Sequence, residues 1–292
     1  MKKAFTLIEL MVVIGIIAIL TGVLLASLSG STDGAKAAKC QANLHSLGLG
    51  ALSQAMANRV YPFAGSIVKQ TDLSMRKQKV VHGWVGWSEN STSGSYISPY
   101  NQNWEARNSS LTNGAIWKAV SANADIFVCP IHREAFRKSN PSAKYAPCWS
   151  YVMNAKFLWA SQTKPFPHTY SSPAYDGLAN KSKTLMFAEL PFIKNEIVSD
   201  VQFNAGAAKD NDPILQYQGC IGNGDELIGF NHRIGKRDVY AHICYADGHV
   251  EKLVLPRNAS ESNIKELTKW LCAPEQGVDV VLEGNEYRKL EN

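Results

Sequence analysis

A thiol and an imidazole lie close together near the middle of this 292-residue chain, at Cys129 and His132. Thiolate sulfur and imidazole nitrogen are the ligands that zinc prefers, and structural zinc sites use four of them, usually as two close pairs. The sequence supplies one close pair here. We therefore predict no zinc centre from this pair.

Two carboxylates further along offer a different metal chemistry. The segment Asp210-Asn211-Asp212-Pro213 places side-chain oxygens at alternate positions, as calcium-binding loops do. It lacks the glycine and the closing glutamate of an EF-hand loop. Calcium held by Asp210 and Asp212 is therefore an alternative to a protein without metal.

Histidines and carboxylates also gather in the C-terminal third of the chain. His232, His242 and His249 lie near Asp247 in the sequence, and such groups can bind a metal or act as acid and base. His242 and His249 need not converge on a hairpin, which favours structural roles. Glu189 ends an apolar strand pattern, and a solvated strand end is its expected environment.

The chain has none of the sequence motifs that we associate with common enzyme mechanisms. It contains no Gly-x-Ser-x-Gly elbow, no His-Glu-x-x-His, no P-loop and no dinucleotide-binding fingerprint. Its formal net charge of +5 is too small to indicate nucleic-acid binding. We therefore expect neither an enzyme nor a nucleic-acid-binding protein, and no cofactor beyond the calcium alternative.

The N-terminal segment is strongly apolar and precedes all of the residues discussed above. An uncharged apolar run of 19 residues extends from Leu10 to Leu28. As a helix it would cover roughly 29 Å, close to the thickness of the hydrocarbon core of a bilayer. Lys2 and Lys3 precede the run, which places the N-terminus in the cytoplasm and the remainder outside. The run is therefore predicted to be a transmembrane helix.

Glu9 distinguishes this segment from a signal peptide or a simple anchor. A carboxylate at mid-membrane costs about 2.5 to 3.5 kcal/mol, and an anchor has no use for it. A signal peptide should also end at a small-residue cleavage site, whereas here the apolar run continues into a further helical pattern. Both observations favour a segment with a specific role.

The stretch Ala4-Phe5-Thr6-Leu7-Ile8-Glu9-Leu10 resembles the processing and N-methylation motif of type IV pilins and type II secretion pseudopilins. The resemblance implies that prepilin peptidase cuts between Ala4 and Phe5 and that the new amino group of Phe5 is methylated. Glu9 would then pair with the terminal amine of a neighbouring subunit during assembly. The family usually has glycine before the cut, where this chain has Ala4.

The head resembles one subfamily of these proteins. Cys129-Pro130 and the later Ser150-Tyr151-Val152-Met153-Asn154 match motifs that recur there. The subfamily also carries a C-terminal histidine followed after nine residues by Asp-Gly. Here His232 precedes Asp247 by fifteen positions, so a fixed contact between that histidine and the turn is not expected. Secretion pseudopilins similar to this chain can hold calcium in the head.

These features predict an α+β fold, in which a long hydrophobic-to-amphipathic N-terminal helix packs on a globular head with an antiparallel β-sheet. Apolar or small residues recur at helical spacing at Cys40, Leu44, Leu47, Ala51 and Ala55, and Pro62 ends the pattern. The helix is expected from about Thr6 to Asn58. The predicted organisation is a leader at 1–4, a membrane or filament-core helix at 5–30, an amphipathic half at 31–58 and a head at 59–292.

Within the head, the clearest pattern is a β-hairpin from Asp238 to Leu255. Asp247-Gly248 suits a two-residue type I′ turn, in which both central residues have positive φ. Apolar segments at 80–87, 125–130 and 183–189 predict further strands, and 111–122 predicts a short helix.

A polar segment from Ser88 to Gly114 holds seven serines and five asparagines among 27 residues. This composition indicates a surface loop. Its aromatic residues, Tyr96, Tyr100 and Trp104, could stack on sugar rings, so a surface-displayed polysaccharide-binding protein is the alternative function. The simpler interpretation is a loop held by half-buried aromatic side chains.

Six cysteines in an exported chain make disulfides possible, and Cys129 with Cys148 is the preferred pair. Several of the cysteines could instead be small buried apolar residues.

The resemblance implies the location and the partners. The chain would be a single-pass inner-membrane protein with its head in the periplasm, and then part of a periplasmic or extracellular filament. Its partners would be other pilin or pseudopilin subunits, prepilin peptidase and the assembly machinery.

Overall fold

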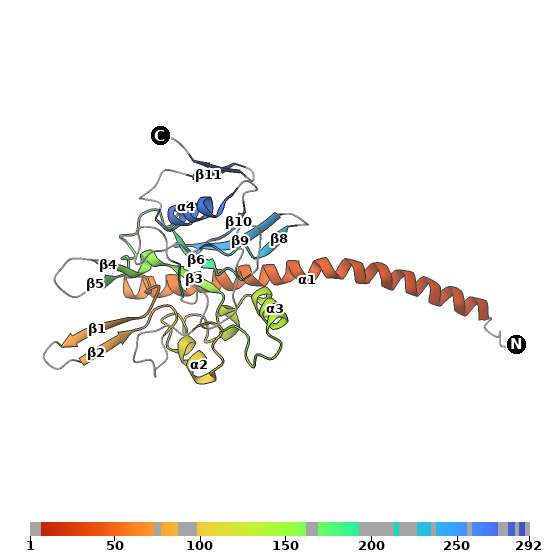
Figure 1. Cartoon of the computed structure of the whole chain (residues 1–292), viewed down its shortest axis with the longest axis horizontal. Coiled ribbons are helices and arrows are strands. Elements are labelled where there is room, and N and C mark those ends of the chain that lie inside the picture. The colour runs from red at the N-terminus through yellow and green to blue at the C-terminus, as the bar shows by residue number, and fades with distance from the viewer. Residues whose placement is uncertain are drawn as a thin grey trace.

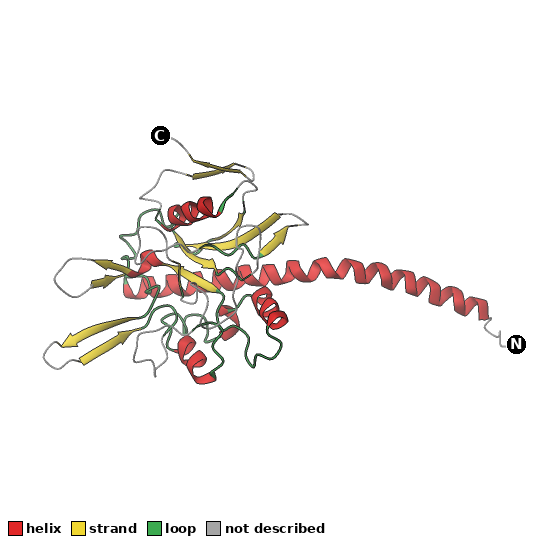
Figure 2. Cartoon of the chain, in the orientation of Figure 1, coloured by secondary structure: helices red, strands yellow, loops and turns green. Residues whose placement is uncertain are grey.

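The computed structural model shows one long helix that enters a head built around a β-sheet (Figures 1 and 2). It describes residues 7–72, 77–86, 98–161, 169–192, 213–215, 227–234, 238–255, 259–273, 280–283 and 286–289. Within these ranges, the side chains of 23–32, 67–72, 77–80, 159–161, 169–171, 280–283 and 286–289 are not described.

Helix α1 runs from Leu7 to Asn58 without interruption. Its bounds agree with the sequence prediction to within one residue at the start and coincide with it at the end. The five residues of the predicted stripe, from Cys40 to Ala55, have no exposed surface. The C-terminal half of α1 is therefore the spine of the head, as its amphipathic pattern indicates.

The N-terminal part of α1 projects away from the head (Figure 1). No helix in the described part of the chain is long and apolar enough to cross a membrane. The predicted transmembrane run from Leu10 to Leu28 ends among residues whose side chains are not described, so that prediction remains a prediction.

The central sheet has six strands in the order β10-β9-β6-β3-β7, and β8 pairs with β9. Helix α1 lies on one face of this sheet and α4 on the other (Figure 1). The strand bounds are β3 Tyr151–Asn154, β6 Leu185–Glu189, β7 Ile214–Leu215, β8 His232–Ile234, β9 Asp238–Tyr245 and β10 Val250–Val254.

The predicted strand at 183–189 is confirmed as β6, and β9 with β10 confirms the hairpin. The pairs of the central sheet are antiparallel, as expected, except at one edge, where β7 runs parallel to β3.

The hairpin turn differs from the predicted type. Gly248 has φ +91, and Asp247 is not among the non-glycine residues of positive φ in the described part of the chain. The amide of Gly248 donates to the carbonyl of Tyr245 at 2.9 Å, and that of Tyr245 donates to His249 at 3.0 Å. These contacts form a three-residue loop with a glycine bulge rather than a type I′ turn.

The turn is also held by hydrogen bonds from α1 and from the segment that follows it. The imidazole Nδ1 of His45 donates to the carbonyl of Gly248 at 3.0 Å, and the Tyr61 hydroxyl donates to the carbonyl of Ala246 at 2.9 Å. Helix and hairpin therefore hold each other in register.

Smaller elements complete the head. α4 is capped by Ser260, whose side chain accepts from Asn263 in a capping box. The strand pairs β1–β2, β4–β5 and β11–β12 form separate two-stranded sheets. The bounds are β1 Ile67–Asp72, β2 Lys77–Val81, α2 Trp104–Thr112, η1 Ala124–Phe127, α3 Pro130–Ser139, η2 Ala155–Leu158, β4 Trp159–Ser161, β5 Thr169–Ser171, α4 Glu261–Cys272, β11 Val280–Glu283 and β12 Glu286–Lys289.

Three local predictions are wrong. The strand expected at 125–130 is instead η1 followed by α3, because Pro130 occupies the first turn of α3, where its missing N–H and fixed φ are favourable. The strand expected at 80–87 stops at Val81, and a Cβ at Gly83 would lie 2.5 Å from the backbone of Gly65. The helix expected at 111–122 does not form: α2 ends at Thr112, and turns follow that end with positive φ at Ser121 and Ala122.

Candidate functional site

The N-terminal motif lies at the free end of α1. Residues 1–6 are outside the described part of the chain, so Ala4 and Phe5 are not placed. Glu9 lies in the first turn of α1 and is exposed. Large apolar side chains surround it, from Leu7 at 76% exposure to Leu20 at 63%.

The second candidate lies inside the head, where two strands share one edge of β9. β6 pairs with β9 through Ala188 opposite Ile243, and β8 pairs with it through His232 opposite Tyr240. Glu189, the last residue of β6, therefore reaches the level of His242, just where β8 begins. The topology brings three titratable side chains together although 53 positions separate Glu189 from His242.

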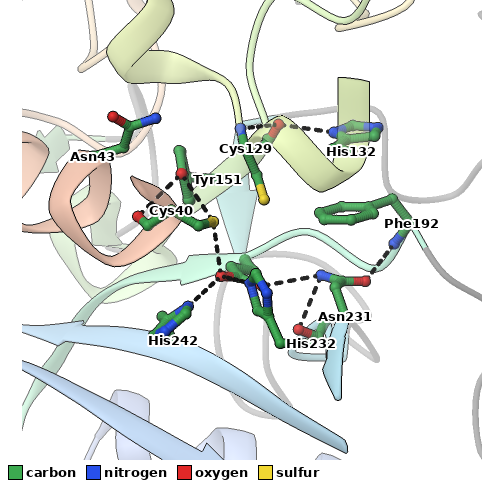
Figure 3. Close-up of polar contacts among 12 residues, drawn as sticks. Cys40, Asn43, Cys129, His132, Tyr151, Phe192, Asn231, His232 and His242 are labelled. Carbon is green, nitrogen blue, oxygen red and sulfur yellow. Dashed lines mark hydrogen bonds and ion pairs between the residues drawn. The ribbon is translucent and has the colours of Figure 1, made fainter. Parts of the chain in front are cut away.

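The carboxylate of Glu189 is fully buried and its oxygens accept hydrogen bonds from four side chains (Figure 3). Its Oε1 accepts from His232 Nε2 at 2.7 Å, from His242 Nδ1 at 3.0 Å and from the Cys40 thiol at 3.1 Å. Its Oε2 accepts from Asn231 Nδ2 at 3.2 Å. A buried carboxylate is tolerated when it is satisfied in this way.

Helix α1 contributes one residue to this cluster. Cys40 faces the sheet from the buried stripe, and its Sγ lies 3.2 Å from the hydroxyl of Tyr151 on β3. The same hydroxyl donates to the Cys40 carbonyl at 3.3 Å. One atom from each of Cys40, Glu189, His232 and His242 lies within 4.8 Å of the others.

The charges of Glu189 and His232 stabilise each other. Burial alone would raise the pKa of Glu189, but the neighbouring His232 and His242 lower it to about 2. Burial alone would lower the pKa of His232, but Glu189 and Cys129 raise it to about 10. At neutral pH the pair is therefore a carboxylate and an imidazolium.

Two thiols lie next to Glu189 and His232, and their pKa values are shifted in opposite directions. Burial raises the pKa of Cys40 well above its ordinary value, and contacts with Cys129 and Glu189 add to the rise. Burial also acts to raise the pKa of Cys129, but hydrogen bonding with Cys40 and His232 lowers it to about 7. In Figure 3 the sulfur of Cys129 points toward the cluster.

His132 does not join Cys129 in a metal site. Its Nδ1 lies 2.8 Å from the Ser150 hydroxyl, its Nε2 lies 3.1 Å from that of Tyr100, and its ring stacks on Phe192. Burial lowers the pKa of His132 to about 3, so the imidazole is neutral.

His249 lies apart from the cluster. Its Nδ1 contacts Asp247 at 2.5 Å, and its side chain is 38% exposed. Asp210 and Asp212, the calcium alternative, lie outside the described residues.

The thiols of Cys129 and Cys148 are free and buried, which corrects the predicted disulfide. The two residues have different neighbours. Cys129 approaches Cys40 and His232, whereas the backbone N–H of Cys148 donates to Pro99 and its thiol lies near Arg107. Cys40 and Cys244 are free and buried as well, and Cys272 is also buried.

The polar segment at 88–114 is described from residue 98 onward and is not a simple loop there. Tyr100 is buried and stacks on Phe136, and α2 occupies Trp104–Thr112. Of the two described candidate sugar platforms, Trp104 is exposed, at 59%, and stands against Tyr145. Tyr96 lies outside the described residues.

Sequence reasoning placed Glu189 at a solvated strand end, and this interpretation is wrong. His242 and His249 do not converge, as expected, but His242 and His232 meet on Glu189, which the sequence did not indicate. A signal was present: Tyr240, His242 and Cys244 share one face of β9, and Glu189 follows four buried residues. The meeting of β6 and β8 at one edge of β9 could not be read from these patterns.

Comparison with known proteins identifies only the N-terminus. Residues 1–25 match the family model of the prokaryotic N-terminal methylation motif. No curated protein and no solved structure matches the chain.

Proposed function

We propose that this chain is a type IV pilin-like or pseudopilin subunit that prepilin peptidase cuts between Ala4 and Phe5. The observation that carries the proposal is the methylation motif at residues 1–25, which leads directly into the exposed part of α1. The motif supports processing. The exposed helix supplies a surface for the partners that the motif implies.

The exposed apolar surface of α1 is too extensive for a helix in water. Leu7, Ile8, Met11, Ile16 and Leu20 are all at least half exposed, on several sides of the helix. Apolar surface in water costs roughly 25 cal/mol per Å², so this part of α1 needs an apolar environment. A bilayer before assembly and the helices of other subunits afterwards would both provide it.

Glu9 has a specific use in such an assembly. A carboxylate among packed apolar helices is strongly unfavourable unless it is paired. The amine of a processed Phe5 has a reference pKa of about 8, so it is mostly protonated at neutral pH, and low dielectric strengthens its attraction to Glu9 of a neighbour. The pair would set the register between neighbouring subunits.

Processing is tested by intact-mass measurement of the protein from membranes. The mature chain should begin at Phe5, and Ala4→Gly should be processed at least as well, because glycine has no side chain at the cut. A mature chain that begins after Leu28 would mean ordinary signal-peptide cleavage and would refute the proposal.

Assembly is tested by comparing sheared filaments with membranes by immunoblot. Glu9→Leu should be processed and inserted but strongly depleted from filaments, since breaking a buried pair costs about 3 to 5 kcal/mol. Glu9→Asp should be intermediate, because the charge remains with a shorter reach. The matched control is Glu105→Leu on the exposed face of α2, which should assemble like wild type. Normal recovery of Glu9→Leu would exclude the pairing role.

A further inference from the structure

We propose that Cys40, Glu189, His232 and His242 form a binding site for one zinc ion in the core of the head. The four residues come from α1, β6, β8 and β9. The sequence predicted no metal centre here, because its ligands are distant along the chain.

The geometry is close to what zinc requires. Zinc bonds of about 2.0 to 2.3 Å in a tetrahedron place neighbouring ligand atoms roughly 3.3 to 3.8 Å apart. The four ligand atoms lie within 4.8 Å of one another, and Glu189 Oε1 already lies 2.7 to 3.1 Å from the other three groups. Figure 3 draws these contacts as dashed lines. Small side-chain rotations would lengthen them to the spacing of zinc ligands.

The donor set selects the class of ion. A thiolate and two imidazoles favour zinc and similar transition metals, whereas calcium and magnesium prefer oxygen ligands. Four protein ligands without an open position are typical of structural zinc rather than catalytic zinc.

The exchange of charge is balanced. When Zn²⁺ binds, the Cys40 thiol releases its proton to solvent, and each histidine coordinates through an unprotonated ring nitrogen. The ion, the thiolate and the carboxylate then sum to zero, so the buried site stays neutral and no uncompensated charge enters the core.

The surroundings of the four residues also suit a metal. Asn231 Nδ2 donates to Glu189 Oε2, which orients the carboxylate and leaves Oε1 directed at the histidines. His232 Nε2 and His242 Nδ1 both face Glu189 Oε1, at 2.7 and 3.0 Å, so each ring already directs one nitrogen at the place where an ion would sit.

A bound ion would join the helix to the sheet. Cys40 is the ligand from α1, and the other three come from neighbouring strands of one sheet. Zinc would thus add a bond across an interface that is also held by apolar packing and by hydrogen bonds such as those of Glu189, Tyr151 and His45.

The experiment uses the full chain, expressed with added zinc, purified in detergent without chelator and analysed for metal by mass spectrometry. Wild type should carry about one zinc ion per chain. Cys40→Ala and His242→Gln should lose most of it. Cys148→Ala and His249→Gln, which remove a buried thiol and a histidine outside the cluster, should retain it. Zinc-free wild type, or full zinc in both cluster variants, would overturn the proposal.

A second measurement does not depend on whether the variants fold. Wild-type chain is treated with chelator, dialysed and titrated with Co²⁺ alone. A tetrahedral site with one thiolate should give intense visible d–d bands and a thiolate-to-cobalt charge-transfer band, both removed by added Zn²⁺. The same bands should appear with Cys148→Ala. Their absence from wild type would overturn the proposal.

Discussion

Glu189 illustrates how a single buried residue can depend on its neighbours. Its carboxylate has no exposed surface, and its Oε1 accepts from His232, His242 and Cys40. Moving a carboxylate out of water is costly, and only opposite charge and hydrogen bonds offset that cost. The residue is therefore stable in the core because its partners are fixed on other elements.

Removing this charge should destabilise the head. In chelator-treated protein, Glu189→Gln is expected to lower the free energy of unfolding by about 3 to 5 kcal/mol, because His232 is left without a buried counter-charge. Chemical denaturation followed by circular dichroism measures the change. The control is Asp176→Asn, whose pair with Arg59 is about three-quarters exposed and should matter by less than about 1 kcal/mol. Equal effects of the two substitutions would contradict this account.

Individual residues were predictable where a local pattern defined their setting. The buried stripe of α1 follows from helical spacing, and the positive φ of Gly248 follows from its place in a turn. Glu189 and His232 were not predictable, because their environment is created by β6 and β8 meeting at β9. Burial of a polar side chain is decided by long-range contacts that spacing along the chain does not report.

Between elements, an ion pair links α1 to α3. Lys36 Nζ lies 2.5 Å from Glu134, and their side chains are 31% and 40% exposed. Hydrogen bonds from Lys138 and Lys36 lower the pKa of Glu134 to about 2. A lowered pKa in the folded state means that the stabilisation is present above the unfolded pKa, near 4.3, and is lost as the pH falls towards 2.

The difference in stability between wild type and Glu134→Gln should therefore depend on pH. We expect wild type to be more stable at pH 7 by less than about 1 kcal/mol, because exposed pairs are screened by solvent. The difference should shrink between about pH 4 and pH 2. Denaturation of both proteins across this range measures it, and effects on the buried cluster cancel because both proteins contain it. A difference that grows in acid would contradict the assignment.

Elements in which apolar residues recur at regular spacing were predictable, and elements whose structure is decided by a single residue were not. Apolar residues recur over many positions in α1 and in the β9–β10 hairpin, so one atypical residue does not hide the pattern. The segment at 125–130 is apolar enough for a strand, but Pro130 begins a helix there. The segment at 80–87 is equally strand-like, yet β2 ends at Val81 and Gly83 comes close to the backbone of Gly65 just beyond it.

At the scale of the whole molecule, α1 divides into two parts with different surroundings. From Ala37 to Ala55 its stripe is buried in the head, whereas from Leu7 to Leu20 its large apolar side chains are exposed. The α+β class and this division were predictable from the sequence. The order of the strands and the parallel pairing of β7 were not, because they depend on connections between distant segments.

This division predicts that the head folds without the N-terminal part. A fragment that begins at Ser31 should be soluble and monomeric by size-exclusion chromatography and should melt cooperatively, because it keeps the buried stripe and loses the exposed apolar surface. The full chain in detergent is the control for its melting temperature. Aggregation, or a molten transition without cooperativity, would contradict the prediction.

The way α1 lies along the head has a mechanical consequence. The helix leaves the head along its own axis, and its buried residues follow one another along that axis from Ala37 to Ala55 (Figure 1). Tension applied at the N-terminal end is therefore carried as shear by all these contacts together, and by the hydrogen bond of His45 to the hairpin turn. Contacts loaded in shear share the force and break together. A pulling experiment should record one abrupt rupture at high force, where a helix peeled sideways would release one turn after another.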